Sequence, residues 1–140
     1  MKRVFFLLLF VTICVMAHAE WIGVAESNDY IVSINDDITK DDRYYLVWVK
    51  YEAKSSALTK ERREFYKDFK KKGFLKYTHF LVLQKFDLNG KRLKNITTVY
   101  YASDKVIESF NFEYESQWEY PVPGSLYEST MNAVKTLVNF

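Results

Sequence analysis

Residues 79–101 read HFLVLQKFDLNGKRLKNITTVYY, a stretch that predicts two β-strands joined by a tight turn at residues 87–90. Asp87 favours the start of a type I turn because its carboxylate can accept hydrogen bonds from nearby backbone N–H groups. Gly90 can take the left-handed conformation that closes a bulged hairpin. We therefore expect a β-hairpin here, with the rest of a β-rich chain organised around it.

Two registers are open for this hairpin. The bulged register sets Asp87 opposite Lys91, which is an attractive pair. The alternative makes Asn89-Gly90 a two-residue type I′ turn and sets Lys85 opposite Lys94. Like charges directly opposite each other destabilise a strand pair, so the sequence favours the bulged register.

Residues 1–19 have the pattern of a signal peptide. Lys2 and Arg3 form a positive start, residues 4–16 are mostly apolar, and residues 17–19 (AHA) fit a cleavage site. The apolar run is shorter than a membrane-spanning helix requires, and a retained anchor is the less favoured alternative. We expect export to the periplasm, the cell surface or the medium, as a mature chain without a transmembrane span.

The mature residues 20–140 number 121, a length that suits one domain with its own core. Loss of Lys2 and Arg3 reduces the 20 basic residues to 18, which balance the 18 acidic residues. A net charge near zero offers no electrostatic argument for a nucleic acid partner, so none is expected. The one cysteine, Cys14, leaves with the signal, so core burial rather than a disulfide must stabilise the domain.

The remaining apolar patterns predict strands at residues 21–25, 30–34, 43–50 and 106–114, with a polar loop over residues 35–42. Both faces of the strand at 43–50 are largely apolar, which predicts a central strand covered on each side. The expected fold class is α+β. We expect a small, mainly antiparallel sheet of about five to six strands, a C-terminal helix packed on it, and a second, basic surface helix.

The C-terminal helix has the clearest boundaries. Ser125 suits the N-cap position, and Glu128 three residues later completes a capping box. Apolar residues between 126 and 138 then form a wide face that predicts packing against the sheet. On this basis Leu137→Asp is expected to cost several kcal/mol, because an unpaired charge would enter the core.

Residues 58–72 predict a surface helix that Thr59 caps and Gly73 ends. Between Lys60 and Lys72 there are seven basic and three acidic residues. Basic and aromatic side chains on one helix suit a polyanion, an anionic lipid or an acidic protein surface, whereas the alternative is a solvated helix face. The candidate partner-binding residues are Arg62, Arg63, Phe65, Lys67, Lys70, Lys71 and Lys72.

Few residues suit catalysis or metal binding. The mature chain has one histidine, His79, which we expect to be a structural strand residue, and it has no cysteine for a zinc site. The acidic loop 35–42 lacks the ligand spacing and glycine of a calcium loop. Asn95-Ile96-Thr97 matches a glycosylation sequon, but it lies within a predicted strand. We therefore expect no catalytic residues, no metal and no cofactor, and a protein that is not an enzyme.

Four features together resemble the bacterial surface-adhesin protein E family, and they span nearly all of residues 21–138. They are Trp21-Ile22-x-Val24 followed by the strand at 30–34, the segment Val47-Trp48-Val49, the Asp87-x-x-Gly90 turn, and Trp118 followed by Pro123-Gly124-Ser125. The resemblance implies a small antiparallel sheet with helices packed on it. It also implies a surface-exported binding domain, since the family's namesake is an adhesin for host matrix and serum proteins.

The chain departs from this family in two respects. Relatives often have a disulfide between a cysteine near the sheet and one in the last helix, and both regions lack cysteine here. The namesake is a lipoprotein, whereas Ile13 precedes Cys14 in this chain and lipidation needs a small residue there. No ligand-contact motif can be carried over.

The expected function is therefore non-enzymatic binding of an extracellular protein or polyanion. The alternative is a periplasmic carrier that holds a small apolar ligand in an aromatic-lined cavity between sheet and helix. A hydrolase is the third and least favoured hypothesis, and it would require an acid and a hydroxyl to converge on His79. The sequence sets neither the ligand nor the oligomeric state.

Overall fold

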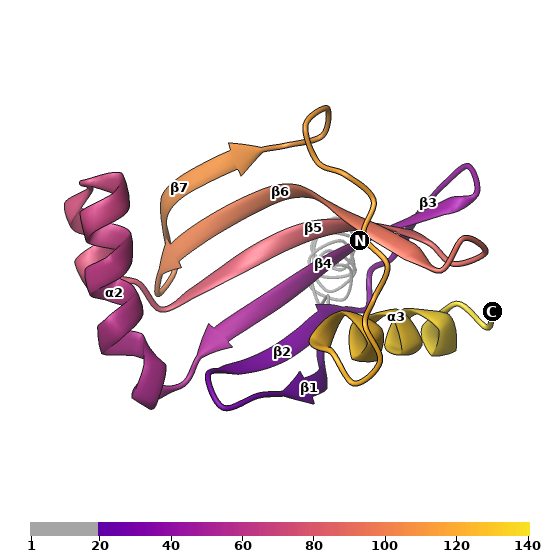
Figure 1. The fold of residues 1–140 in the computed structure, drawn as a ribbon, viewed down its shortest axis with the longest axis horizontal. Coiled ribbons are helices and arrows are strands. Elements are labelled where there is room, and N and C mark those ends of the chain that lie inside the picture. The colour runs from indigo at the N-terminus through magenta and orange to yellow at the C-terminus, as the bar shows by residue number, and fades with distance from the viewer. Residues whose placement is uncertain (1–19) are drawn as a thin grey trace, which may run out of the picture.

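The structure is a computed structural model that describes residues 20–140, so the expected signal peptide lies outside the described residues. The described chain is α+β, with a seven-stranded antiparallel sheet and two α-helices (Figure 1). No helix within residues 20–140 is long and apolar enough to cross a membrane. The strands are β1 (Trp21–Glu26), β2 (Tyr30–Asn35), β3 (Thr39–Asp41), β4 (Tyr44–Ala53), β5 (His79–Asp87), β6 (Arg92–Ala102) and β7 (Lys105–Asn111). The helices are α2 (Ser55–Phe69), α3 (Leu126–Leu137) and the short 3₁₀ helix η1 (Lys72–Lys76).

The sheet order is β1-β2-β4-β5-β6-β7, and β3 pairs with the first residues of β4. The central position of β4 agrees with its apolar pattern. The short strand β3 lies within residues 35–42, which the sequence predicts to be a loop. All three of its residues are polar and exposed, so backbone pairing alone makes it a strand and no apolar pattern marks it. This strand brings the described sheet to seven strands rather than about five to six.

One face of the sheet, which we call the covered face, carries the main core and is packed by α3. Val47 and Val49 of β4 and Phe86 of β5 are fully buried there. They belong to the same cluster as Met131 and Val134 of α3. Full burial of an apolar side chain contributes roughly 1.5–3 kcal/mol, so these contacts fix α3 on the sheet.

A polar chain joins α3 to the same face. The Gln84 side-chain amide donates to Asn95 Oδ1 at 2.9 Å, and Asn95 Nδ2 donates to the Tyr127 hydroxyl oxygen at 3.3 Å. The sequon asparagine therefore takes part in an internal contact between β5, β6 and α3 in the folded domain.

A second core lies where α2 crosses the end of the sheet (Figure 1). Phe74 and Tyr77, in and just after η1, are fully buried and pack with Ile107 of β7. Tyr100 of β6 joins them, with its ring centroid 5.5 Å from that of Phe74. Because η1 is short and its apolar residues follow no long period, the sequence does not predict it.

The opposite face, which we call the open face, carries the alternate side chains of the same strands. Leu46 and Trp48 of β4 and Leu81 and Leu83 of β5 are half-buried, and none of them belongs to either core cluster. The helices within residues 20–140 contribute their buried side chains to the other face. The expectation that β4 is covered on each side is therefore wrong for the described residues.

The predicted hairpin register is also wrong. Lys85 lies opposite Lys94, and Asp87 lies opposite Arg92. The turn uses the four residues 88–91, and Lys91, not Gly90, takes the left-handed conformation, with φ of 51°. The repulsion between the lysines is offset by contacts from segments distant in the sequence, which are described below.

The N-terminus of α3 confirms the predicted capping box. Ser125 Oγ accepts a hydrogen bond from the Glu128 N–H at 3.2 Å, and Glu128 Oε1 accepts one from the Gly124 N–H at 3.2 Å. The prediction for Leu137 is wrong, because this side chain is 40% exposed. Leu137 does not belong to the main core, whereas Met131 and Val134 of the same helix do.

Candidate binding site

The basic helix begins and ends earlier than the sequence predicts. α2 starts at Ser55, and its N-cap residue is Lys54, whose N–H donates to the Asp29 carbonyl oxygen. Thr59 lies inside the helix and does not cap it. Lys70 ends the helix in the left-handed conformation, which leaves Gly73 in η1. The start is set by the end of β4 and its contact with another loop, which no local capping signal reports.

Three of the seven candidate residues on and after this helix have structural contacts. Phe65 packs edge-on against Tyr77, with ring centroids 5.1 Å apart, and belongs to the second core. Arg62 Nε donates to the Tyr77 carbonyl oxygen at 2.8 Å. Lys71 forms an ion pair with Glu108 of β7 at 3.1 Å. These contacts hold α2 against the sheet. They explain why an arginine, a phenylalanine and a lysine occupy these positions without invoking a binding partner.

The other four candidates, Arg63, Lys67, Lys70 and Lys72, are exposed. An acidic group lies beside them on the first turns of α2, where Glu61 and Glu64 line a pocket together with Asp29. Burial, together with the negative charges of Asp29 and Glu64, raises the pKa of the Glu61 carboxyl to about 7. The helix therefore carries both signs of charge.

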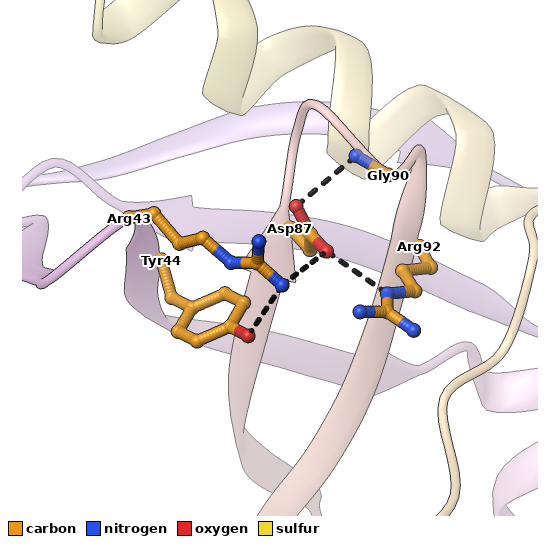
Figure 2. A network of polar contacts seen from close by, with 5 residues as sticks. All are labelled: Arg43, Tyr44, Asp87, Gly90 and Arg92. Carbon is orange, nitrogen blue, oxygen red and sulfur yellow. Dashed lines mark hydrogen bonds and ion pairs between the residues drawn. The ribbon is translucent and has the colours of Figure 1, made fainter.

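A network centred on Asp87 lies at the hairpin end of the sheet (Figure 2). The Asp87 side chain is only 4% exposed, and its Oδ1 accepts the Gly90 N–H at 3.1 Å. Arg92 Nε donates to Oδ2 at 2.9 Å, and an Arg43 terminal nitrogen lies 3.9 Å from the same oxygen. Burial raises the pKa of Asp87, but the Gly90 and Arg92 hydrogen bonds and the arginine charges outweigh it and hold the pKa below its usual value.

Gly90 is required by this network for its size. A Cβ atom at this position would lie 2.6 Å from Asp87 Oδ2, closer than such atoms approach each other. The glycine lets the turn close over the carboxylate, which then accepts the turn's own N–H. The Asp87-x-x-Gly90 pattern thus stabilises the turn through a hydrogen bond from the Gly90 N–H to Asp87, although the hairpin does not have the predicted register.

Two aromatic rings beside this network each carry two cations, and we call the group the cation–aromatic cluster. The Tyr44 and Trp118 ring centroids are 5.4 Å apart. Arg43 and Lys85 lie 5.0 and 4.8 Å from the Tyr44 centroid. Arg92 and Lys94 lie 4.6 and 5.3 Å from the Trp118 centroid. The cluster consists of Arg43, Tyr44, Lys85, Arg92, Lys94 and Trp118.

The cluster could not be found from any one stretch of sequence. Trp118 reaches it because Glu119 pairs with Leu93 of β6 through two backbone hydrogen bonds, of 2.9 and 2.7 Å. The one available signal was the rival register with Lys85 opposite Lys94. A like-charge pair held in a sheet indicates compensating partners elsewhere in the chain.

His79, the first residue of β5, has a structural setting. Its ring stacks on Tyr101 with centroids 4.9 Å apart, and its Nδ1 lies 2.9 Å from the Thr78 hydroxyl. Burial lowers the pKa of this imidazole, although the nearby Glu52 opposes the shift. Within residues 20–140, no three side chains of the metal-ligating types come together.

A groove of about 380 Å³ lies between β1 and α3. Ile22 and Val24 line it from the strand, and Ala133 and Leu137 line it from the helix. None of its lining residues is aromatic. It therefore differs from the aromatic-lined cavity that the carrier hypothesis predicts.

Comparison of this chain with known protein families, with curated proteins and with solved structures gave no match.

Proposed function

We propose that this chain is an exported, non-enzymatic binding domain, similar in kind to the bacterial surface-adhesin protein E family, that binds an extracellular protein or polyanion. The α+β fold, with a C-terminal helix packed on an antiparallel sheet, supports the proposal because this is the architecture the resemblance implies. The signal-like pattern of residues 1–19 supports export.

The open face is the observation that carries the proposal. α3 and η1 pack on one side of the sheet, whereas Trp48 and its neighbours on the other side remain half-buried. A half-buried Trp flanked by leucines is the type of residue that dominates binding energy at protein interfaces. The domain thus presents the open sheet face to a partner, while its helices pack in the two cores and stabilise the fold.

The first test is where the protein resides. Producing cells are fractionated, and intact cells are treated with a protease that cannot cross the outer surface. The proposal predicts a processed chain that begins at Glu20 and is degraded on intact cells. A chain confined to the cytoplasm and protected from the protease would contradict it.

The second test is binding to a panel of immobilised matrix and serum proteins. We expect saturable binding to at least one of them. The variant Lys67→Gln, Lys70→Gln, Lys71→Gln, Lys72→Gln tests the basic segment separately. Reduced binding would include this segment in the contact surface, and unchanged binding would restrict that surface to the sheet.

A further inference from the structure

The cation–aromatic cluster holds more positive charge than its own partners neutralise. Asp87 is shared between Arg43 and Arg92, and Asp41 lies 3.5 Å from Lys85 Nζ. Lys94 has no carboxylate within ion-pair distance among residues 20–140, and its Nζ donates to the Glu113 carbonyl oxygen at 3.4 Å. Four cations and two carboxylates leave a local charge of +2, although the 18 basic and 18 acidic residues of 20–140 balance as a whole.

This excess positive charge lies where it destabilises the sheet. Lys85 and Lys94 face each other across β5 and β6, and like charges in that position destabilise a sheet. Their side chains are also partly withdrawn from water, since the Lys85 side chain is 18% exposed. Asp41 and the two aromatic rings offset part of this repulsion, and a bound anion would remove the remainder, so the arrangement favours an anionic ligand.

We propose that the cation–aromatic cluster binds a sulfated polysaccharide. Sulfate groups are fully ionised oxyanions, and they accept hydrogen bonds from both guanidinium and ammonium groups. The rings of Tyr44 and Trp118 hold the long cationic side chains in place, so little side-chain freedom is lost on binding. Arg43, whose side chain is 57% exposed, leaves the cluster accessible from solvent.

A repeating chain fits this site better than a nucleic acid does. The mature chain has no net positive charge, whereas nucleic acid binders carry an extended basic surface. The cluster instead gathers four cations around two aromatic rings, and such closely spaced cations suit the clustered sulfates of a polysaccharide. The assignment rests on the proposed function only in placing the protein where such polymers occur.

Immobilised heparin tests the assignment, with the protein purified from its own cells. Lys85→Gln combined with Lys94→Gln should weaken binding by at least about tenfold, since two charge-assisted contacts are lost. The slope of log affinity against log salt should fall by about 2. The matched control, Lys76→Gln with Lys105→Gln, removes two exposed cations outside both the cluster and the basic segment, and should alter affinity by less than about twofold. Fully desulfated heparin should not compete.

Three results would overturn the proposal. They are equal losses in the two double variants, competition by desulfated heparin, or tighter binding of a single-stranded oligonucleotide than of heparin. Thermal unfolding checks that the variants fold. If the lysine variant does not fold, Arg43→Gln replaces it, because Arg92 still pairs with Asp87 in that variant. If the native protein binds a matrix or serum protein but not heparin, this inference alone is rejected. If it binds neither heparin nor any matrix or serum protein, the proposed function is rejected as well.

Discussion

The contact between Gly90 and Asp87 gives the sharpest stability prediction. Gly90→Ala places a methyl carbon only 2.6 Å from Asp87 Oδ2, closer than such atoms approach each other. The carboxylate must move, and it then loses the Gly90 N–H and strains its bond to Arg92. Hydrogen bonds to charged groups contribute roughly 1.5–3 kcal/mol each, and the Arg92 bond is worth less because that side chain is 27% exposed. We expect Gly90→Ala to lower the free energy of unfolding by about 2–3 kcal/mol.

A double-mutant cycle separates this steric effect from the loss of a glycine. Asp87→Ala removes the obstacle and should cost about 3 kcal/mol on its own. In that background Gly90→Ala should cost less than about 0.5 kcal/mol, because Gly90 has no positive φ and the remaining close atom, Arg92 Nε at 3.1 Å, ends a flexible side chain. Gly23→Ala is the matched control: no atom lies within 4 Å of its Cβ position, so it should be nearly neutral.

Urea unfolding followed by tryptophan fluorescence measures all five proteins, with m-values compared to confirm the same transition. The reasoning predicts a coupling energy of about 2 kcal/mol between positions 87 and 90. Equal costs of Gly90→Ala with and without the Asp87 carboxylate would refute it. So would a loss in Gly23→Ala as large as that in Gly90→Ala.

Three further predictions concern the core and the pH dependence of stability. Val134→Asp should cost at least about 4 kcal/mol in urea unfolding, whereas Leu137→Asp on the exposed side of α3 should cost less than about 1 kcal/mol. Phe74→Ala should cost about 3–5 kcal/mol by the same measurement, because it leaves a cavity in the second core. The raised pKa of Glu61, about 7, means that the folded state holds a proton which the unfolded state has released, so stability contributed by this group falls as pH rises from about 4 to 7. Glu61→Gln should therefore match the native protein near pH 4 and exceed it near pH 8 by about 1–2 kcal/mol in unfolding free energy, after allowance for solvent screening; equal stabilities at both pH values would refute this.

The sequence predicts those parts of the fold that depend on local periodicity and capping. The apolar run of β4, the hairpin of β5 and β6, and the Ser125–Glu128 box are all readable because each signal lies within a few residues. β3 and η1 escape prediction for the opposite reason. A polar strand held by backbone pairing and a short 3₁₀ turn held by tertiary burial have no pattern of their own.

The candidate site was less predictable than the fold. A basic run on a helix is visible in sequence, yet Arg62, Phe65 and Lys71 prove to hold that helix against the sheet. The cation–aromatic cluster joins residues up to 75 positions apart, Arg43 and Trp118, through sheet pairing. The predicted hairpin register is wrong for the same reason, because the contacts that offset the repulsion between Lys85 and Lys94 come from residues distant in the sequence.

The most direct test of the central claim compares two apolar side chains on opposite faces of the domain. Trp48 lies on the open face, and Leu137 lies on α3 and is 40% exposed. The dissociation constant for a bound matrix protein is measured for Trp48→Ser and for Leu137→Ser, each checked by thermal unfolding. If the open sheet face is the binding surface, Trp48→Ser should weaken binding by at least about tenfold while Leu137→Ser leaves it unchanged. Unchanged binding in folded Trp48→Ser, or a loss confined to Leu137→Ser, would contradict the account.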